Sequence, residues 1–190
     1  MTTLPLTIRL AGRDDAEAVA AFGERTFRET FGPYNRAEDM DAYCVATYAL
    51  ERQRREIADP DRVTILAEVG DELAGYAQLR KGPVPECVMG PAPIELLRFY
   101  VDRPWHGQGL AAALMAEVIA QAEERGGRTL YLCVWERNVR AIAFYRKQGL
   151  RSVGTQLFLL GDDRQVDLVM VWQIGEGSQP AFSAPRSPVS

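Results

Sequence analysis

The segment from Glu95 to Ala113 constrains the fold of this chain more than any other part of it. Its sequence, ELLRFYVDRPWHGQGLAAA, predicts a buried strand, a glycine-rich turn and an alanine-rich helix in direct succession. Such a junction directs several backbone N–H groups and the positive end of a helix dipole at one point. Because a phosphate or pyrophosphate suits that point, the segment predicts a site for a phosphorylated cofactor.

Apolar periodicity and turn residues divide the rest of the chain into alternating strands and helices. Strands are expected at residues 6–10, 63–69, 72–80, 94–101, 129–135, 150–160 and 165–174. Helices are expected from a cap at Asp14 or Asp15 to about Phe31 and at residues 37–49, 110–125 and 138–148, and residues 51–57 favour a helix. The order β-α-α-β-β-β-α-β-α-β-β predicts an α/β fold, a mixed sheet with helices on both faces.

Length, charge and cysteine usage narrow the class of protein. The 190 residues predict one domain over residues 1–174, followed by a tail at 175–190 whose composition predicts disorder. A net charge of −4 gives no basic surface for nucleic acid, and no apolar run reaches membrane-spanning length. Three scattered cysteines and one histidine predict neither a disulfide framework nor a metal site, and favour a cytoplasmic location.

The turn itself supports more than one interpretation. Residues 106–111, HGQGLA, resemble the cofactor loop of the GNAT acetyltransferases, Gln/Arg-x-x-Gly-x-Gly/Ala, in which Gly109 and Ala111 match. His106 departs from the pattern, although a neutral imidazole can still form a hydrogen bond to a phosphate. A dinucleotide fingerprint ending at Ala112 is the competing motif, but the acidic residue expected after it is missing. The glycines can also serve only to pack the helix on the strand.

A second motif favours the GNAT interpretation. Residues 132–150, LCVWERNVRAIAFYRKQGL, resemble the family pattern V-x-x-x-N-x-x-A-x-x-F/Y-Y-x-x-x-G-F. The matching residues are Asn138, Ala141, Phe144, Tyr145 and Gly149, with Leu150 in place of the usual phenylalanine. An aromatic residue such as Tyr145 would by itself be read as part of the core. Beside Asn138 and the glycine loop it is read as functional.

The resemblance to GNAT acetyltransferases extends from the first strand to about Ile174, and it is strongest to the spermidine/spermine acetyltransferases similar to PaiA. It implies a mostly antiparallel sheet of about seven strands with about four helices, and acetyl-CoA as the co-substrate of an N-acetyltransferase. Within that site Tyr145 would protonate the departing thiolate, which a phenol with a pKa of about 10 can do. The cofactor-binding residues it implies are Phe99, Tyr100, Val101, His106, Gly107, Gln108, Gly109, Leu110, Ala111, Ala112, Ala113, Asn138, Ala141 and Tyr145.

The amine acceptor needs a base, because an aliphatic ammonium with a pKa of about 10.4 is protonated at neutral pH and cannot attack. Glu95 is the expected base, placed six residues before Val101 and so on the same face of the strand. It can equally be a charge at the exposed entrance of the strand. Glu136 is the weaker alternative, since it can also cap a helix or pair with Arg137 or Arg140.

Acceptor specificity is assigned to residues 30–41, where Tyr34, Glu38 and Asp39 can form an acidic, aromatic pocket for a polyamine. A solvated helix start explains the same acids equally well. The expected function is therefore transfer of an acetyl group to a small-molecule primary amine, a polyamine first. The alternatives are an amino acid, an aminoglycoside or a protein N-terminus as acceptor, a non-catalytic acyl-CoA sensor, and a nucleotide-dependent oxidoreductase. No nucleic acid or membrane partner is expected, and family members often form homodimers.

Overall fold

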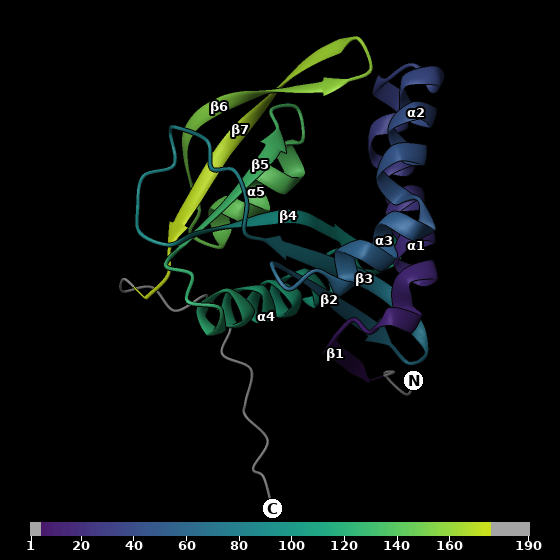
Figure 1. The fold of residues 1–190 in the computed structure, drawn as a ribbon, viewed down its shortest axis with the longest axis horizontal. Helices are drawn as coiled ribbons and strands as arrows, with labels where there is room; N and C mark the ends of the chain where they lie inside the picture. The colour runs from purple at the N-terminus through teal and green to yellow at the C-terminus, as the bar shows by residue number, and fades with distance from the viewer. Residues whose placement is uncertain (1–4, 176–190) are drawn as a thin grey trace, which may run out of the picture.

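The computed structural model describes residues 5–175, which contain one seven-stranded sheet of order β1-β2-β3-β4-β5-β7-β6 (Figure 1). The strands are β1 Leu6–Leu10, β2 Arg62–Val69, β3 Glu72–Arg80, β4 Pro93–Val101, β5 Thr129–Trp135, β6 Arg151–Leu160 and β7 Asp163–Gln173. All neighbours are antiparallel except β4 and β5, which are parallel. The predicted mixed sheet is confirmed. The predicted disordered tail lies, beyond Gly175, outside the described residues.

Helices cover both faces of the sheet, as predicted. They are α1 Ala16–Phe31, α2 Ala37–Tyr48, α3 Leu50–Ala58, α4 Leu110–Glu124 and α5 Val139–Lys147. The α1–α3 layer lies on one face and α4 on the other (Figure 1). Residues 51–57, which favour a helix in the sequence, form α3, so the described residues hold five α-helices where the family resemblance implied about four. No helix among residues 5–175 is long and apolar enough to cross a membrane.

The start of α1 differs from its prediction. Asp15 occupies the N-cap position but its side chain makes no capping hydrogen bond to the helix. Its carboxylate instead accepts hydrogen bonds from the Arg9 side chain, at 2.8 Å, and from the Gly12 N–H, at 2.7 Å. The predicted cap is therefore wrong, because a strong cation from β1 competes for the same oxygens.

Hydrophobic clusters on both faces hold the helices to the sheet. The largest cluster packs α4 and α5 on one face, and its fully buried members include Ile65, Leu79, Leu114, Met115 and Leu132. On the other face α1 packs against β2 and β3 through Val19, Phe22, Leu66 and Tyr76. Each helix buries one apolar stripe, so the periodicity of the sequence accounts for this layering.

A bulge interrupts the pairing of β4 with β3. Gln78 pairs with Arg98 and Leu79 with Leu96, which leaves Leu97 as the extra residue on β4. Before the bulge Glu95 lies opposite Arg80, and after it Arg98 and Tyr100 continue on that same face. The expectation that Glu95 and Val101 share a face is wrong, because one extra residue reverses the alternation.

Strands β4 and β5 separate soon after they meet. Only Pro93–Glu95 pairs with Thr129–Tyr131, whereas β5 stays paired with β7 as far as Trp135. Figure 1 shows β5 rising away from β4 beyond this short contact. The splayed strand predicted for Phe99–Val101 is confirmed, and its backbone edge toward β5 carries no strand partner.

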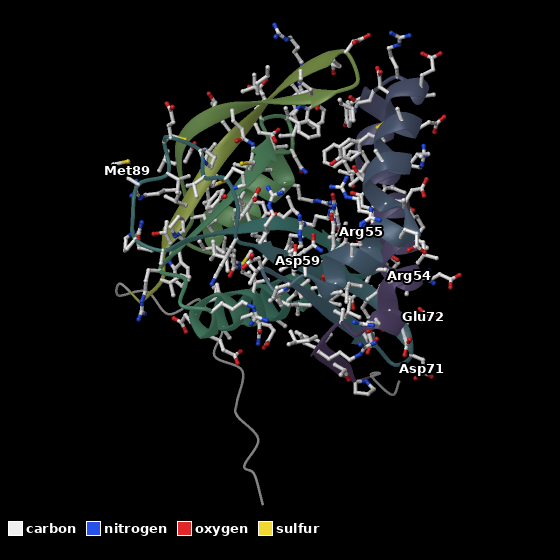
Figure 2. All side chains as sticks on the ribbon, in the orientation of Figure 1. Arg54, Arg55, Asp59, Asp71, Glu72 and Met89 are labelled. Atoms are coloured by element: carbon white, nitrogen blue, oxygen red, sulfur yellow. The ribbon has the colours of Figure 1, made fainter. Side chains whose placement is uncertain are left out.

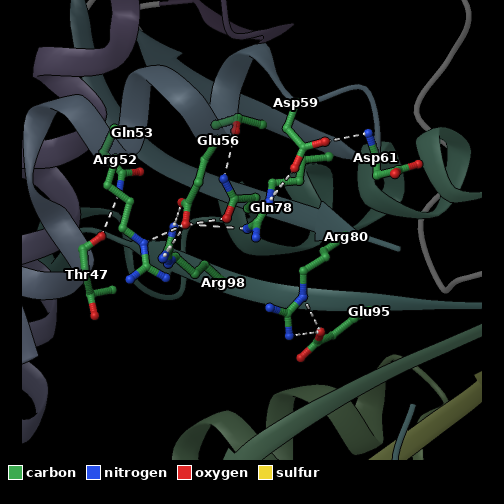
Figure 3. A network of polar contacts seen from close by, with 12 residues as sticks. Thr47, Arg52, Gln53, Glu56, Asp59, Asp61, Gln78, Arg80, Glu95 and Arg98 are labelled. Atoms are coloured by element: carbon green, nitrogen blue, oxygen red, sulfur yellow. Dashed lines mark hydrogen bonds and ion pairs between the residues drawn. The ribbon is translucent and has the colours of Figure 1, made fainter. Parts of the chain in front are cut away.

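A buried ion network fixes α3 to the strands beside the bulge (Figure 3). Arg98 Nη1 donates to Glu56 and, at 2.9 Å, to Gln78 Oε1, while Arg52 Nε donates to Glu56 Oε1 at 2.9 Å. Burial raises the pKa of Glu56, but the hydrogen bonds from Arg98 and Arg52 outweigh it and hold the pKa below its ordinary value. The carboxylate is thus kept ionised as the partner of a buried guanidinium.

We predict that Glu56→Ala lowers the free energy of unfolding by about 3–5 kcal/mol, because it leaves the Arg98 charge buried without a carboxylate. Urea denaturation at neutral pH measures the change. The matched control is Glu51→Ala, which removes an exposed pair with Arg54 at the outer edge of the same helix (Figure 2) and should change stability by less than about 0.5 kcal/mol. Equal effects of the two variants would contradict this account.

Candidate active site

A cavity of about 500 Å³ opens where β4 and β5 separate. It is lined from both faces of the sheet, since residues of α1, β4, β5, α5, β6 and β7 all contribute. Ten predicted site residues are among its lining: Glu95, Phe99, Tyr100, Val101, His106, Gly107, Ala111, Asn138, Ala141 and Tyr145. The fold therefore brings the two sequence motifs to one place.

The glycine loop forms the N-terminus of α4. Gly107 and Gly109 adopt φ values of +76° and +87°, which residues with a side chain rarely adopt. Among the hydrogen bonds of residues 5–175, none uses the N–H groups of Leu110, Ala111 and Ala112. Those three first-turn groups are available to an anion.

Two other N–H groups of the loop already donate hydrogen bonds within the protein, so fewer groups than predicted are free to bind a phosphate. The Gln108 N–H donates to the Trp105 carbonyl at 3.3 Å, and the Ala113 N–H donates to the Gly109 carbonyl at 3.0 Å. We expected the backbone of residues 108–113 to wrap a phosphate over its whole length. The structure limits the free N–H groups to the central residues of that range, Leu110, Ala111 and Ala112. The side chain of Leu110 is buried in the core, so only its backbone faces the site.

His106 is held by the protein through both ring nitrogens. Its Nε2 lies 2.8 Å from the Val101 carbonyl oxygen, and Arg140 Nη1 lies 2.6 Å from its Nδ1. Because a guanidinium only donates, Nδ1 accepts and Nε2 donates. Neither ring nitrogen is free for a phosphate, so the direct imidazole contact expected from the sequence is wrong. His106 instead holds a cation, Arg140, beside the loop.

Tyr145 lines the cavity from α5. It is 8% exposed and packs edge-to-face on Phe99, with ring centroids 6.2 Å apart. Asn138 caps the helix as predicted, since its Oδ1 accepts from the Ala141 N–H at 3.2 Å. Burial, with a smaller contribution from Tyr100, raises the pKa of Tyr145 above its usual value. The phenol therefore stays protonated and is able to donate.

Glu95 lies inside the cavity and not at an exposed entrance. It is 7% exposed, and Arg80 Nε donates to its Oε2 at 2.8 Å, as Figure 3 shows. Glu136 is exposed and is absent from the lining of the cavity, so the structure does not support it as a base. Glu95 is therefore a carboxylate whose charge is already matched by a guanidinium.

A second buried carboxylate was missed by the sequence reasoning. Asp167 of β7 lies between Trp135 of β5 and Gln156 of β6, is 9% exposed and lines the cavity. Within residues 5–175 its side chain has no hydrogen bond or ion pair, and burial raises its pKa to about 6. The signal was present in the sequence, because Asp167 is the single charged residue in the otherwise apolar run 166–172.

The acidic pocket expected from Tyr34, Glu38 and Asp39 does not form. Tyr34 is 66% exposed and packs against Trp135 beside a smaller cavity of about 280 Å³. Glu38 is exposed and pairs with Arg36 at 2.7 Å, and Asp39 packs under the turn at Gly161. Aromatic residues line this side of the main cavity instead: Phe27, Phe31, Tyr43, Trp135 and Phe158.

Comparison with known proteins identifies the family. Residues 25–150 match the model of the acetyltransferase (GNAT) family. The chain belongs to the GNAT acetyltransferases. It is 33% identical over 160 residues to a Mycobacterium bovis protein described as an uncharacterized N-acetyltransferase, covering 84% of this chain and 98% of that one. This GNAT acetyltransferase is accordingly an enzyme that transfers an acetyl group from acetyl-CoA to an amine.

Solved structures share the fold of this acetyltransferase. PaiA N-acetyltransferase from Thermoplasma acidophilum, in complex with coenzyme A, gives a TM-score of 0.70 at 18% identity, covering 90% of this chain and 99% of that one. The ribosomal-protein-S18-alanine N-acetyltransferase from Escherichia coli gives a TM-score of 0.62 at 18% identity, covering 94% and 100%. Within the described part of the acetyltransferase, no three His, Cys, Asp or Glu side chains gather into a group able to hold a metal ion.

We predict that Asp167→Asn stabilises the acetyltransferase at pH 8. A pKa of about 6, against an ordinary value of 3.8, means that the folded protein favours the neutral carboxyl by on the order of 3 kcal/mol. That stabilisation is fully present below pH 3.8 and is lost as the pH rises through about 6, and the asparagine avoids the loss. Urea titrations from pH 4 to pH 8 should show the two proteins diverging as the pH rises, whereas a variant less stable at pH 8 would reveal a structural hydrogen bond.

Proposed function

We propose that this enzyme acetylates a primary amine of a small cationic molecule that carries no carboxylate, and that a polyamine is the first acceptor to test. The observation that carries the proposal is the charge distribution of the cavity. Arg80 is matched by Glu95 and Arg98 by Glu56, whereas Asp167 has no cation beside it. The acceptor side of the cavity therefore has an unmatched negative charge.

The walls of the cavity fit the same acceptor class. An ammonium near Trp135 or Tyr43 gains cation–π attraction, and its methylene groups pack on Phe27, Phe31 and Phe158. An amino acid would place a carboxylate beside Asp167 and Glu95, where Arg80 and Arg98 are already paired with carboxylates, and this costs free energy. The second candidate acceptor is a protein N-terminus, because a structure with the same fold is the E. coli ribosomal-protein-S18-alanine N-acetyltransferase.

The cofactor is assigned to the splayed half of the site. The unpaired backbone edge of Phe99–Val101 provides hydrogen-bonding groups for the pantetheine arm, and an N–H on this edge is able to polarise the thioester carbonyl. The free N–H groups at the start of α4, with the Arg140 guanidinium nearby, suit the pyrophosphate. Asn138 and Ala141 line the cavity between these two parts.

The chemistry follows from the side chains that surround the gap. The amine nitrogen attacks the acetyl carbonyl carbon, the C–N bond forms and the C–S bond breaks. Tyr145, kept protonated by burial, gives its proton to the departing thiolate. A carboxylate in the cavity accepts the proton that the ammonium must lose, and the carboxylates that line the cavity are Glu95 and Asp167.

An acceptor panel tests this proposal. The protein is incubated with acetyl-CoA and spermidine, benzylamine, an amino acid, an aminoglycoside or a peptide with a free N-terminus, and the release of CoA thiol is measured. We expect release with spermidine or benzylamine and at least about tenfold less with the amino acid. Faster release with the peptide or the amino acid would contradict the proposal. Binding of acetyl-CoA without release for any acceptor would indicate a sensor.

We predict that Tyr145→Phe lowers kcat for the working acceptor by about 10²-fold, since the thiolate then departs without a proton donor. The ring remains to pack on Phe99, so the dissociation constant for CoA, measured by calorimetry, should stay within about twofold of the parent protein. An unchanged kcat would exclude Tyr145 as the acid, and a large loss of CoA binding would make it a binding residue instead.

A further inference from the structure

We propose that Asp167 is a catalytic residue, which binds the ammonium of the acceptor and takes its proton. The inference rests on the proposed function, because it concerns the same cavity and the same amine. It assigns to a residue of β7 the task that the sequence assigned to Glu95 of β4.

The position of Asp167 in the sheet supports this assignment. Asp167 lies opposite Trp135, which packs against Phe31 of α1 with ring centroids 5.9 Å apart. Its side chain therefore lies on the face that the α1–α3 layer covers, where the aromatic walls of the cavity lie. Tyr145 clusters with the core on the other face, among residues of α4 and α5. The proton acceptor and the proton donor thus approach the gap from opposite sides.

Among the described residues no cation forms an ion pair with Asp167, and Arg140, the one guanidinium of the cavity lining without a carboxylate partner, holds His106 beside the glycine loop. Across the cavity Glu95 of β4 is paired with Arg80 of β3. The other titratable groups on this side of the cavity are the Cys133 thiol of β5, whose pKa burial raises with smaller contributions from Glu95 and Asp167, and the Tyr43 phenol of α2, whose pKa burial also raises. Both stay neutral near pH 7, so a substrate ammonium is the charge that this carboxylate lacks.

Glu95 is less suited to the same task. Both of its hydrogen bonds from Arg80 end on Oε2, and the ion pair compensates the negative charge that would attract and deprotonate an ammonium. Asp167 is buried without such a partner, and its raised pKa lies closer to neutrality, where a general base works best. Glu95 then acts as a positioning residue that fixes Arg80 at the point where the strands separate.

The protons balance in this scheme. The acceptor enters as an ammonium and leaves as an amide, so its nitrogen loses two protons. The first passes to a carboxylate oxygen of Asp167 and then to solvent, which frees the lone pair for attack. The second replaces, directly or through water, the proton that Tyr145 has given to the CoA sulfur. The products are the acetylamide, CoA thiol and one proton in solution.

Kinetics of three variants test the inference, with the acceptor that proves active among spermidine and benzylamine. We expect Asp167→Asn to lower kcat/KM for the amine by about 10²-fold or more, with the KM for acetyl-CoA within about twofold. We expect Glu95→Gln to cost less than about tenfold, and Glu136→Gln, the exposed control, to have no effect. A larger loss in Glu95→Gln than in Asp167→Asn would overturn the assignment.

The pH dependence separates a base from a structural residue. In the parent protein kcat/KM should fall as the pH drops through about 6, because a protonated carboxyl cannot accept a proton. In Asp167→Asn that inflection should vanish, and the rate should rise with pH toward the amine pKa of about 10.4. An inflection that persists in Asp167→Asn and disappears in Glu95→Gln would overturn the proposal.

A titration keeps the inference testable when no amine is acetylated. That outcome alone overturns the proposed acceptor class. Carbon-13 NMR of labelled aspartate, compared with Asp167→Asn, measures the pKa of Asp167 directly in the CoA complex. A value near 6 that falls when benzylamine hydrochloride is added supports an ammonium site at Asp167. A value near 4, unchanged by benzylamine, overturns it.

Discussion

The site depends on the short parallel pairing of β4 with β5. Strands β4 and β5 pair over three residues each, Pro93–Glu95 with Thr129–Tyr131, and then diverge. A parallel sheet normally continues its hydrogen bonds along both strands, and stopping them leaves a row of unpaired backbone groups in the centre of the molecule. The unpaired backbone groups border a cavity, where solvent or a substrate can form hydrogen bonds to them. The same divergence lets residues from both faces of the sheet meet in one space.

The bulge at Leu97 determines which side chains meet there. By reversing the alternation of β4, it places Glu95, Arg98 and Tyr100 on the α1–α3 face, and Phe99 and Val101 on the α4 face. Arg98 is thereby free to join Glu56 inside the protein, which fixes α3 beside the bulge. Phe99 meets Tyr145 on the other side. One extra residue thus puts Glu95 and Tyr100 on one face of the sheet and Phe99, beside Tyr145, on the other.

Much of this architecture could be predicted from the sequence, because it follows from local patterns. The seven strands, the glycine turn before α4 and the Asn138 cap of α5 each have a short-range physical cause, and the structure confirms them. The bulge could not be predicted, since nothing in the run Leu96-Leu97-Arg98 distinguishes a bulged strand from a regular one. The partners of His106, Glu95 and Asp15 were missed for a related reason: each is an arginine that only the fold brings beside its partner. Asp167 interrupts the apolar run 166–172 of the sequence, but its burial without a partner is a tertiary property.

We propose that acetyl transfer takes place in the gap between β4 and β5, with Tyr145 on the thiol side. A crystal structure of the protein with CoA tests this proposal. We expect the pantetheine arm to lie along Phe99–Val101, the pyrophosphate to meet the N–H groups of Leu110–Ala112, and the CoA sulfur to lie within hydrogen-bond reach of the Tyr145 phenol, at about 3–3.5 Å. A sulfur placed away from Tyr145, or an arm that leaves the gap empty, would contradict it.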